Sequence, residues 1–318
     1  MNRVSLKDWF LIGCLCVVGL SGCTQPGEAL TDRKKRENDA EIVQYITTNN
    51  LTGKAQTTDN GTWYVITTTN PTGQTAGAGD EIKYHYTLSR FDGLIVDSSN
   101  VAANIPIVFT RGVFTPSATL SAGVYDGIVN SGAVKTGLER VGLRKGESAT
   151  LLVPSYLNSG RPGTLLLPQY SPVRYDVKVV SVRTEDQQIQ EYLKAAKITP
   201  TFSETTGLRV VVAQARPDSV QITTGKTVSL NYRGSLLNGV TFDPPNSPTG
   251  TKLLEVKIGI NQVVPGFDQG LSKLRQGEKA TLIFPSALGY GIAGNPQGAV
   301  KIPPYSSLVF YVEIISVK

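Results

Sequence analysis

Residue types that support covalent or metal chemistry are scarce in this sequence. The 318 residues include one histidine, His85, and three cysteines, Cys14, Cys16 and Cys23. A metal centre built from several imidazoles is therefore excluded, and a catalytic triad has a single candidate base. We expect neither a metal site nor a cofactor.

The composition is that of a folded, mainly β protein with more than one domain. Hydrophobic residues make up 40% and charged residues 18%, which excludes both a disordered chain and a membrane bundle. The 32 glycines and 18 prolines indicate many turns between short strands. The net charge of +6 gathers into no long basic run, so nucleic acid is not expected as a partner. The length predicts two or three domains.

The first residues have the features of an export signal. Arg3 and Lys7 precede an uncharged stretch from Trp9 to Leu20. This stretch has the length of a signal-peptide core and is shorter than the roughly 20 residues that a membrane-spanning helix needs. The sequence Leu20-Ser21-Gly22-Cys23 follows directly and resembles a bacterial lipobox. The resemblance implies cleavage before Cys23 and a diacylglycerol on its sulfur; an ordinary secretory signal is the alternative.

The lipobox resemblance predicts the cellular location and the fate of the cysteines. We expect a signal peptide over residues 1–22 and a polar tether over residues 23–38. Lipid chains on Cys23 would hold the protein on a membrane of the cell envelope, either the outer membrane or the periplasmic face of a membrane. The other two cysteines leave with the signal peptide, so the mature chain would have no free thiol.

The remainder of the chain consists of two similar copies. Three segments recur, at offsets of 146, 131 and 135 residues: 82–97 as 228–243, 143–155 as 274–286, and 175–182 as 310–317. A short helical pattern precedes each copy, over residues 40–49 and 187–197. Long repeats with drifting offsets indicate a duplicated domain, with copies over 39–182 and 183–318. The drift places about fifteen extra residues in the first copy, between Asp97 and Gly137, and four extra in the second, around residues 297–300.

The second copy predicts an α+β domain. Hydrophobic residues alternate over 228–232, 280–284 and 308–314, which is the pattern of strands with one buried face. Between the first two segments, Phe267, Leu271 and Leu274 share one face of a short helix. We therefore expect an antiparallel sheet wrapped around this helix.

Six motifs of the second copy resemble the FKBP-type peptidyl-prolyl cis-trans isomerases. They are NYRG (231–234), NGVTFD (238–243), VVPGFDQGL (263–271), LRQGE (274–278), LGYG (288–291) and IPPYSSLVFYVEI (302–314). The resemblance implies two tandem domains, each a five- or six-stranded antiparallel half-barrel with a helix across its concave face. It also implies an apolar pocket for a prolyl ring.

The resemblance implies roles for particular residues of this pocket. The predicted catalytic set is Asp243, Tyr290, Val264 and Phe267, in which the Val264 N–H and the Tyr290 hydroxyl hold substrate carbonyls. The predicted substrate-binding set is Tyr232, Phe242, Leu254, Val263, Ile302 and Phe310. This sequence departs from the family pattern at Leu254, usually aromatic, at Phe267, often tryptophan, and at Asn295, commonly histidine. These departures affect substrate preference more than activity.

The implied reaction needs no nucleophile or metal. Rotation about an X–Pro bond crosses about 18–20 kcal/mol, because amide resonance is lost on the way. An apolar pocket disfavours the planar, well-solvated amide more than the twisted form, which is catalysis by differential binding. The partners implied are proline-containing unfolded or exported polypeptides.

The first copy retains the frame of the pocket but lacks its large side chains. By alignment, Val96 replaces Phe242 and Ser159 replaces Tyr290, while Thr136 or Leu138 stands at the position of Phe267. We expect this copy to fold alike and to isomerise poorly or not at all.

Two other functions remain open at the level of sequence. The protein could be a chaperone that holds unfolded exported chains. It could also be a surface lipoprotein that keeps the isomerase fold as a scaffold.

Overall fold

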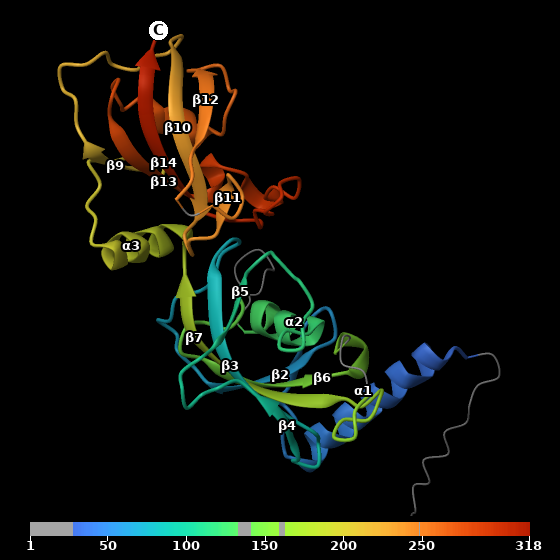
Figure 1. The fold of residues 1–318 in the computed structure, drawn as a ribbon. Coiled ribbons are helices and arrows are strands. Elements are labelled where there is room, and N and C mark those ends of the chain that lie inside the picture. Colours follow the sequence, from blue (N-terminus) through green and yellow to red (C-terminus); the bar gives the residue numbers. More distant parts are fainter. Residues whose placement is uncertain (1–27, 133–140, 159–162, 248) are drawn as a thin grey trace, which may run out of the picture.

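The computed structural model describes residues 28–132, 141–158, 163–247 and 249–318. The predicted signal peptide, Cys23 and the start of the predicted tether lie outside these residues, as do Thr136, Leu138 and Ser159. Within them the chain forms two similar units of mixed helix and antiparallel sheet (Figure 1), which confirms the predicted α+β fold.

The first unit contains a seven-stranded sheet in the order β1-β2-β6-β7-β3-β4, in which β5 also pairs with β3. Its elements are α1 (Leu30–Thr48), β1 (Gln56–Thr57), β2 (Trp63–Thr68), β3 (Glu81–Ser89), β4 (Ile95–Ser98), β5 (Ile107–Thr110), α2 (Ala122–Asn130), β6 (Ser148–Val153), the 3-10 turn η1 (Ser155–Leu157) and β7 (Val173–Arg183). The helix α2 lies within the curve of the sheet (Figure 1).

The second unit repeats this topology, with the strand order β11-β10-β14-β13-β9-β8 and with β12 paired to β10. Its elements are α3 (Glu185–Ala196), β8 (Phe202–Ser203), β9 (Arg209–Gln214), β10 (Thr227–Leu236), β11 (Thr241–Asp243), β12 (Lys252–Lys257), α4 (Pro265–Leu271), β13 (Lys279–Phe284), η2 (Ser286–Leu288), η3 (Gly291–Ala293) and β14 (Leu308–Val317). Two short strands, β11 and β12, pair with successive parts of β10, so one sheet edge is built from two segments.

Each central helix lies directly on its sheet because two glycines face the strand beneath it. A Cβ on Gly266 would lie 2.4 Å from the ring of Phe284, and a Cβ on Gly270 would lie 2.7 Å from Leu282. In the first copy, Gly123 and Gly127 make the same close approach to Val153 and Leu151, at 2.3 and 2.6 Å. Any larger side chain at these four positions would push the helix off the sheet.

These glycine pairs correct the alignment of the two copies. Gly123 and Gly127 correspond to Gly266 and Gly270, an offset of 143 residues, so Val124 is the counterpart of Phe267. The prediction of Thr136 or Leu138 at this position is wrong. Three of the extra residues of the first copy therefore precede α2 and twelve follow it. The helix of the first copy lacks counterparts of Pro265 and Phe267, so no residue type marked its position in the sequence. The prediction relied on the repeat offset alone and placed the helix too far toward the C-terminus.

The helix that precedes each sheet belongs to the repeated unit. On α1, Ile42 and Ile46 pack against Leu152, while on α3, Ile189 and Leu193 pack against a cluster that includes Ile283. This packing is the same in both copies, at an offset of 147 residues for the helices.

The helix α1 begins at Leu30, ten residues before the expected start at Ala40. Residues 30–38 of the predicted tether are therefore helical. The Asn38 side chain donates to the Tyr170 carbonyl at 2.9 Å and accepts from the Ser155 N–H at 2.6 Å, so this part of the helix is docked on η1 and the loop before β7. No helix within the described ranges is both long enough and apolar enough to cross a membrane.

The close approach of α4 to β13 predicts a large cost for a single methyl group. We expect Gly266→Ala to lower the free energy of unfolding of the second unit by about 1–3 kcal/mol, because the methyl overlaps the Phe284 ring. Gly77→Ala is the control, since its Cβ meets nothing closer than Asp80 at 3.6 Å. Urea unfolding followed by circular dichroism measures both variants; equal midpoints would contradict the packing argument.

Candidate active site

A cavity of about 720 Å3 lies over the concave face of the second sheet. Strands β10, β11, β12 and β14 contribute its floor and one wall, the start of α4 contributes a second wall, and the loop from Tyr290 to Ile302 contributes the third. All ten residues predicted for the pocket line this cavity: Tyr232, Phe242, Asp243, Leu254, Val263, Val264, Phe267, Tyr290, Ile302 and Phe310.

The floor of the cavity is a cluster of aromatic rings around Phe310. Its ring centroid lies 4.9 Å from that of Phe267 and 5.6 Å from that of Phe242, both in edge-to-face geometry. Tyr232 completes the cluster at 5.9 Å from Phe267. Such pairs favour one another beyond the area they bury, so the rings form a rigid apolar surface.

Gly234 on β10 makes this cluster possible. A Cβ at this position would lie 2.6 Å from Phe242 and 2.7 Å from Phe310. Its φ is outside the left-handed region, so glycine is needed here for space and not for backbone conformation. The two rings can meet over β10 only because the backbone beneath them is bare.

The polar rim of the cavity is organised by Asp243. The Tyr232 hydroxyl donates a hydrogen bond to this carboxylate, and the Lys252 ammonium lies 3.6 Å from its other oxygen. Burial raises the pKa of the Tyr232 hydroxyl above its ordinary value, and the hydrogen bond to Asp243 and its charge raise this pKa further. The hydroxyl therefore stays protonated at neutral pH and holds the carboxylate in place at the rim.

Two donors that line the cavity are available to a ligand. In the hydrogen bonds found among the described residues, neither the Val264 N–H nor the Tyr290 hydroxyl has a partner. Val264 is the residue before Pro265, the first residue of α4, and Tyr290 precedes the short turn η3. A polypeptide in the cavity could satisfy both donors with its carbonyl groups.

Six further residues line the cavity, of which only Asn295 stood out in the sequence, as a departure from the family pattern: Pro245, Gln262, Asn295, Gly298, Ala299 and Val300. Four of them belong to the loop between Tyr290 and Ile302, where the second copy has its extra residues. Two backbone hydrogen bonds between Asn295 and Ile302, of 2.8 and 2.9 Å, close this loop against the cavity. The change in repeat offset from 131 to 135 predicted extra residues in this loop. The residue types of the loop did not indicate that it lines the cavity.

The first copy fills the corresponding space with its own side chains. Leu88 stands in the place of Gly234, Val124 in that of Phe267 and Tyr175 in that of Phe310, and all three are 0% exposed. The register of β4 places Val96 at the position of Phe242, as predicted. The frame is kept, because the Tyr86 hydroxyl donates to Asp97 at 2.8 Å. His85 is buried on the opposite side of β3, beside Ser99 and Asn104.

Comparison with known proteins connects both copies to one family. The model of FKBP-type peptidyl-prolyl cis-trans isomerases matches residues 218–315. FK506-binding protein 2 of Dictyostelium discoideum is 43% identical over 104 residues, which are 32% of this chain and 74% of that protein. The peptidyl-prolyl cis-trans isomerase FKBP10 of Mus musculus is 30% identical over 242 residues, 75% of this chain and 34% of that protein.

The chain spans about a third of the length of FKBP10 and related proteins that it matches. Among solved structures, FkpA from Escherichia coli has 34% sequence identity and a TM-score of 0.35, over 42% of this chain and 59% of that one. The family resemblance carried by the six motifs is confirmed by the sequence relatives. On this identity and coverage, the chain belongs to the FKBP-type peptidyl-prolyl cis-trans isomerase family.

Proposed function

We propose that the second copy catalyses cis/trans isomerisation of X–Pro bonds in exported polypeptides. The observation that supports this most is the aromatic cavity itself, in which two free donors, the Val264 N–H and the Tyr290 hydroxyl, accompany an apolar floor. This arrangement can bind a prolyl ring and the carbonyl groups beside it. Because the reaction exchanges no covalent bond, it needs no nucleophile from the cavity.

Catalysis would arise from the difference between the planar and the twisted amide. The twisted amide is less dipolar, so it loses less than the planar form when it leaves water for the rings around Phe310. The Val264 and Tyr290 donors would hold the flanking carbonyls while the bond rotates. Asp243, fixed by Tyr232, would orient the amide at the rim. A hundredfold acceleration requires only about 2.7 kcal/mol of differential stabilisation.

The floor of the cavity gives a direct test with a matched control. In the full chain, we expect Phe267→Val to lower kcat/KM for a prolyl peptide by about tenfold, the equivalent of about 1.4 kcal/mol of transition-state stabilisation. Val124→Ala removes apolar volume at the counterpart position of the first copy and should leave the rate unchanged. A protease-coupled peptide assay measures both. If Val124→Ala lowered the rate as much as Phe267→Val, the reaction would not belong to the second copy.

The bare backbone at Gly234 gives a second test. We expect Gly234→Ala to lower kcat/KM by about tenfold, because the added methyl displaces the rings of Phe242 and Phe310. Gly239→Ala is the control on the same hairpin, since its Cβ would meet no atom within 4 Å although its φ is +86°. Thermal unfolding of both variants separates loss of the pocket from loss of the fold. Full activity of Gly234→Ala would show that the ring cluster does not define the site.

We also propose that the protein is exported and held on a membrane of the cell envelope by lipid on Cys23. The support is the charged start, the uncharged stretch from Trp9 to Leu20 and the lipobox-like Leu20-Ser21-Gly22-Cys23. Two or more acyl chains anchor a protein stably, whereas one chain does not.

A single cysteine distinguishes lipid anchoring from ordinary secretion. In a Gram-negative host fed with labelled palmitate, we expect the wild type and Cys16→Ser to incorporate label and to sediment with membranes. Cys23→Ser should lose the label and appear in the soluble fraction. Label retained by Cys23→Ser, or release of all three proteins as soluble forms, would contradict lipid attachment at this cysteine.

A further inference from the structure

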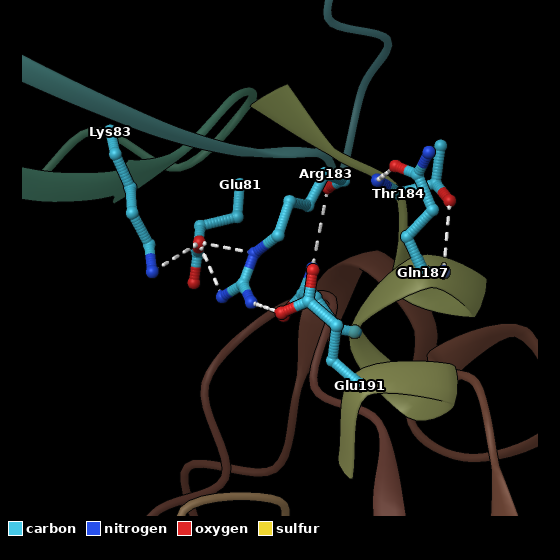
Figure 2. Close-up of polar contacts among 7 residues, drawn as sticks. Glu81, Lys83, Arg183, Thr184, Gln187 and Glu191 are labelled. Carbon is cyan, nitrogen blue, oxygen red and sulfur yellow. Dashed lines mark hydrogen bonds and ion pairs between the residues drawn. The ribbon is translucent and has the colours of Figure 1, made fainter. Parts of the chain in front are cut away.

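The two copies are joined by a single residue between strand and helix. The strand β7 ends at Arg183, Thr184 caps the next helix, and α3 begins at Glu185. The Thr184 hydroxyl accepts from the Gln187 N–H and the Gln187 side chain accepts from the Thr184 N–H, as Figure 2 shows. This capping box fixes Thr184 to the first turn of α3, which limits the freedom of the link to bend.

An ion-pair cluster reinforces this link. The Arg183 guanidinium donates to Glu81 on β3 at 2.9 and 2.6 Å and also pairs with Glu191 on α3 (Figure 2). Arg183 therefore links a carboxylate of the first sheet, Glu81, to a carboxylate of α3, Glu191.

The helix α3 is itself attached to the second sheet. The Glu185 carboxylate accepts hydrogen bonds from the Ser286 N–H at 2.7 Å, the Ser286 hydroxyl at 2.6 Å and the Ser307 hydroxyl at 3.0 Å. Its buried face, with Ile189 and Leu193, packs on the same sheet. Since α3 is held by the second copy and Arg183 holds α3 to the first, the orientation of the two copies is constrained.

In this orientation Tyr305 of the second copy lies against two glycines of the first. A Cβ on Gly79 would lie 2.6 Å from the Tyr305 ring, and a Cβ on Gly112 would lie 3.3 Å from it. The ring can approach the backbone of the first copy this closely only because neither residue has a side chain. Together with the neighbouring Pro303 and Pro304, Tyr305 lines a hollow of about 600 Å3 between the copies. Directly after the loop, Tyr305 therefore bridges to the first copy.

Tyr305 also contacts the loop from Tyr290 to Ile302, which forms the third wall of the cavity. Its N–H donates to the Gly291 carbonyl at 3.0 Å, directly after Tyr290 in the chain. Ile302, three residues earlier, lines the cavity. The counterpart of Tyr305 in the first copy, Tyr170, has a similar left-handed φ of 63° against 56°, but its side chain is 39% exposed.

We propose that the first copy positions this wall of the cavity in the second through Tyr305, which makes Tyr305 a positioning residue for isomerisation. The inference rests on the proposed function. A wall held by the Gly79 and Gly112 backbone is ordered before substrate arrives, so substrate binding does not have to supply the cost of ordering it. The first copy would thus contribute to activity without a pocket of its own.

The ring of Tyr305 provides the first test, in the full chain. We expect Tyr305→Ala to raise KM for a prolyl peptide about fivefold with kcat nearly unchanged, because the ordering cost falls equally on bound substrate and transition state. Tyr305→Phe keeps the ring and should restore the wild-type KM. Tyr170→Ala makes the same change at the same backbone conformation in the first copy and should have no effect. An unchanged KM in Tyr305→Ala would overturn the proposal.

The glycine side of the contact tests the coupling from the first copy. Gly79→Ala should raise KM like Tyr305→Ala and should add nothing in a protein that already carries Tyr305→Ala. Gly93→Ala is the matched control, since its φ is +91° against +86° for Gly79 but its Cβ would meet no atom within 4 Å. Additive effects, or an equal effect of Gly93→Ala, would overturn the proposal.

Hydrogen exchange distinguishes this proposal from the proposed function. We expect amides of residues 291–302 to exchange about fivefold faster in Tyr305→Ala than in the wild type, and at the wild-type rate in Tyr170→Ala. If the wild type lacked isomerase activity, the proposed function would fail, and the exchange rates would still decide whether the first copy orders the loop. Unchanged exchange in Tyr305→Ala would refute the positioning role whatever the activity.

Discussion

The candidate site depends on the close contact of aromatic rings with backbone that carries no side chain. Phe242 and Phe310 meet over Gly234, and α4 brings Phe267 to the same cluster because Gly266 and Gly270 let the helix lie on β13. Each contact removes apolar surface from water and fixes ring orientation at once. The shape of the cavity therefore depends on the glycines beneath the rings as much as on the aromatic residues themselves.

The first copy shows what the same frame becomes when this condition changes. Leu88 occupies the place of Gly234, and the aromatic residues at two neighbouring positions are replaced by Val96 and Val124. The sheet order, the glycines under the helix and the bond from Tyr86 to Asp97 all persist. The fold and the pocket therefore have different requirements. The fold requires the glycines on the face of the central helix that meets the sheet, and the pocket requires in addition Gly234 on β10.

Much of the fold and site could be predicted from the sequence, because the second copy keeps its motifs in order. Every predicted pocket residue, including Leu254 at a position that is usually aromatic in the family, lines the cavity. Gln262 and Val300 were missed, since residues in irregular loops have no periodicity that indicates their neighbours. Val124 was missed because the helix of the first copy lacks the aromatic signal of Phe267.

Long-range contacts explain the other differences. The first nine residues of α1 are mostly polar, so no apolar pattern predicts a helix there, yet Asn38 bonds to Tyr170, 132 residues away. The contact of Tyr305 with Gly79 depends on how two folded copies meet, which no local pattern encodes.

The attachment of α3 determines what can be excised as an independent module. The family match starts at residue 218, but Ile283 and Val309 on the outer face of the second sheet are covered by Ile189 and Leu193 of α3. A fragment that begins at residue 218 would lack α3, so Ile283 and Val309 would be exposed to solvent. It would also lack the Glu185 carboxylate, which accepts a hydrogen bond from the Ser286 N–H. The duplicated unit therefore consists of the sheet, its central helix and the helix that precedes them, which is α1 in the first copy and α3 in the second.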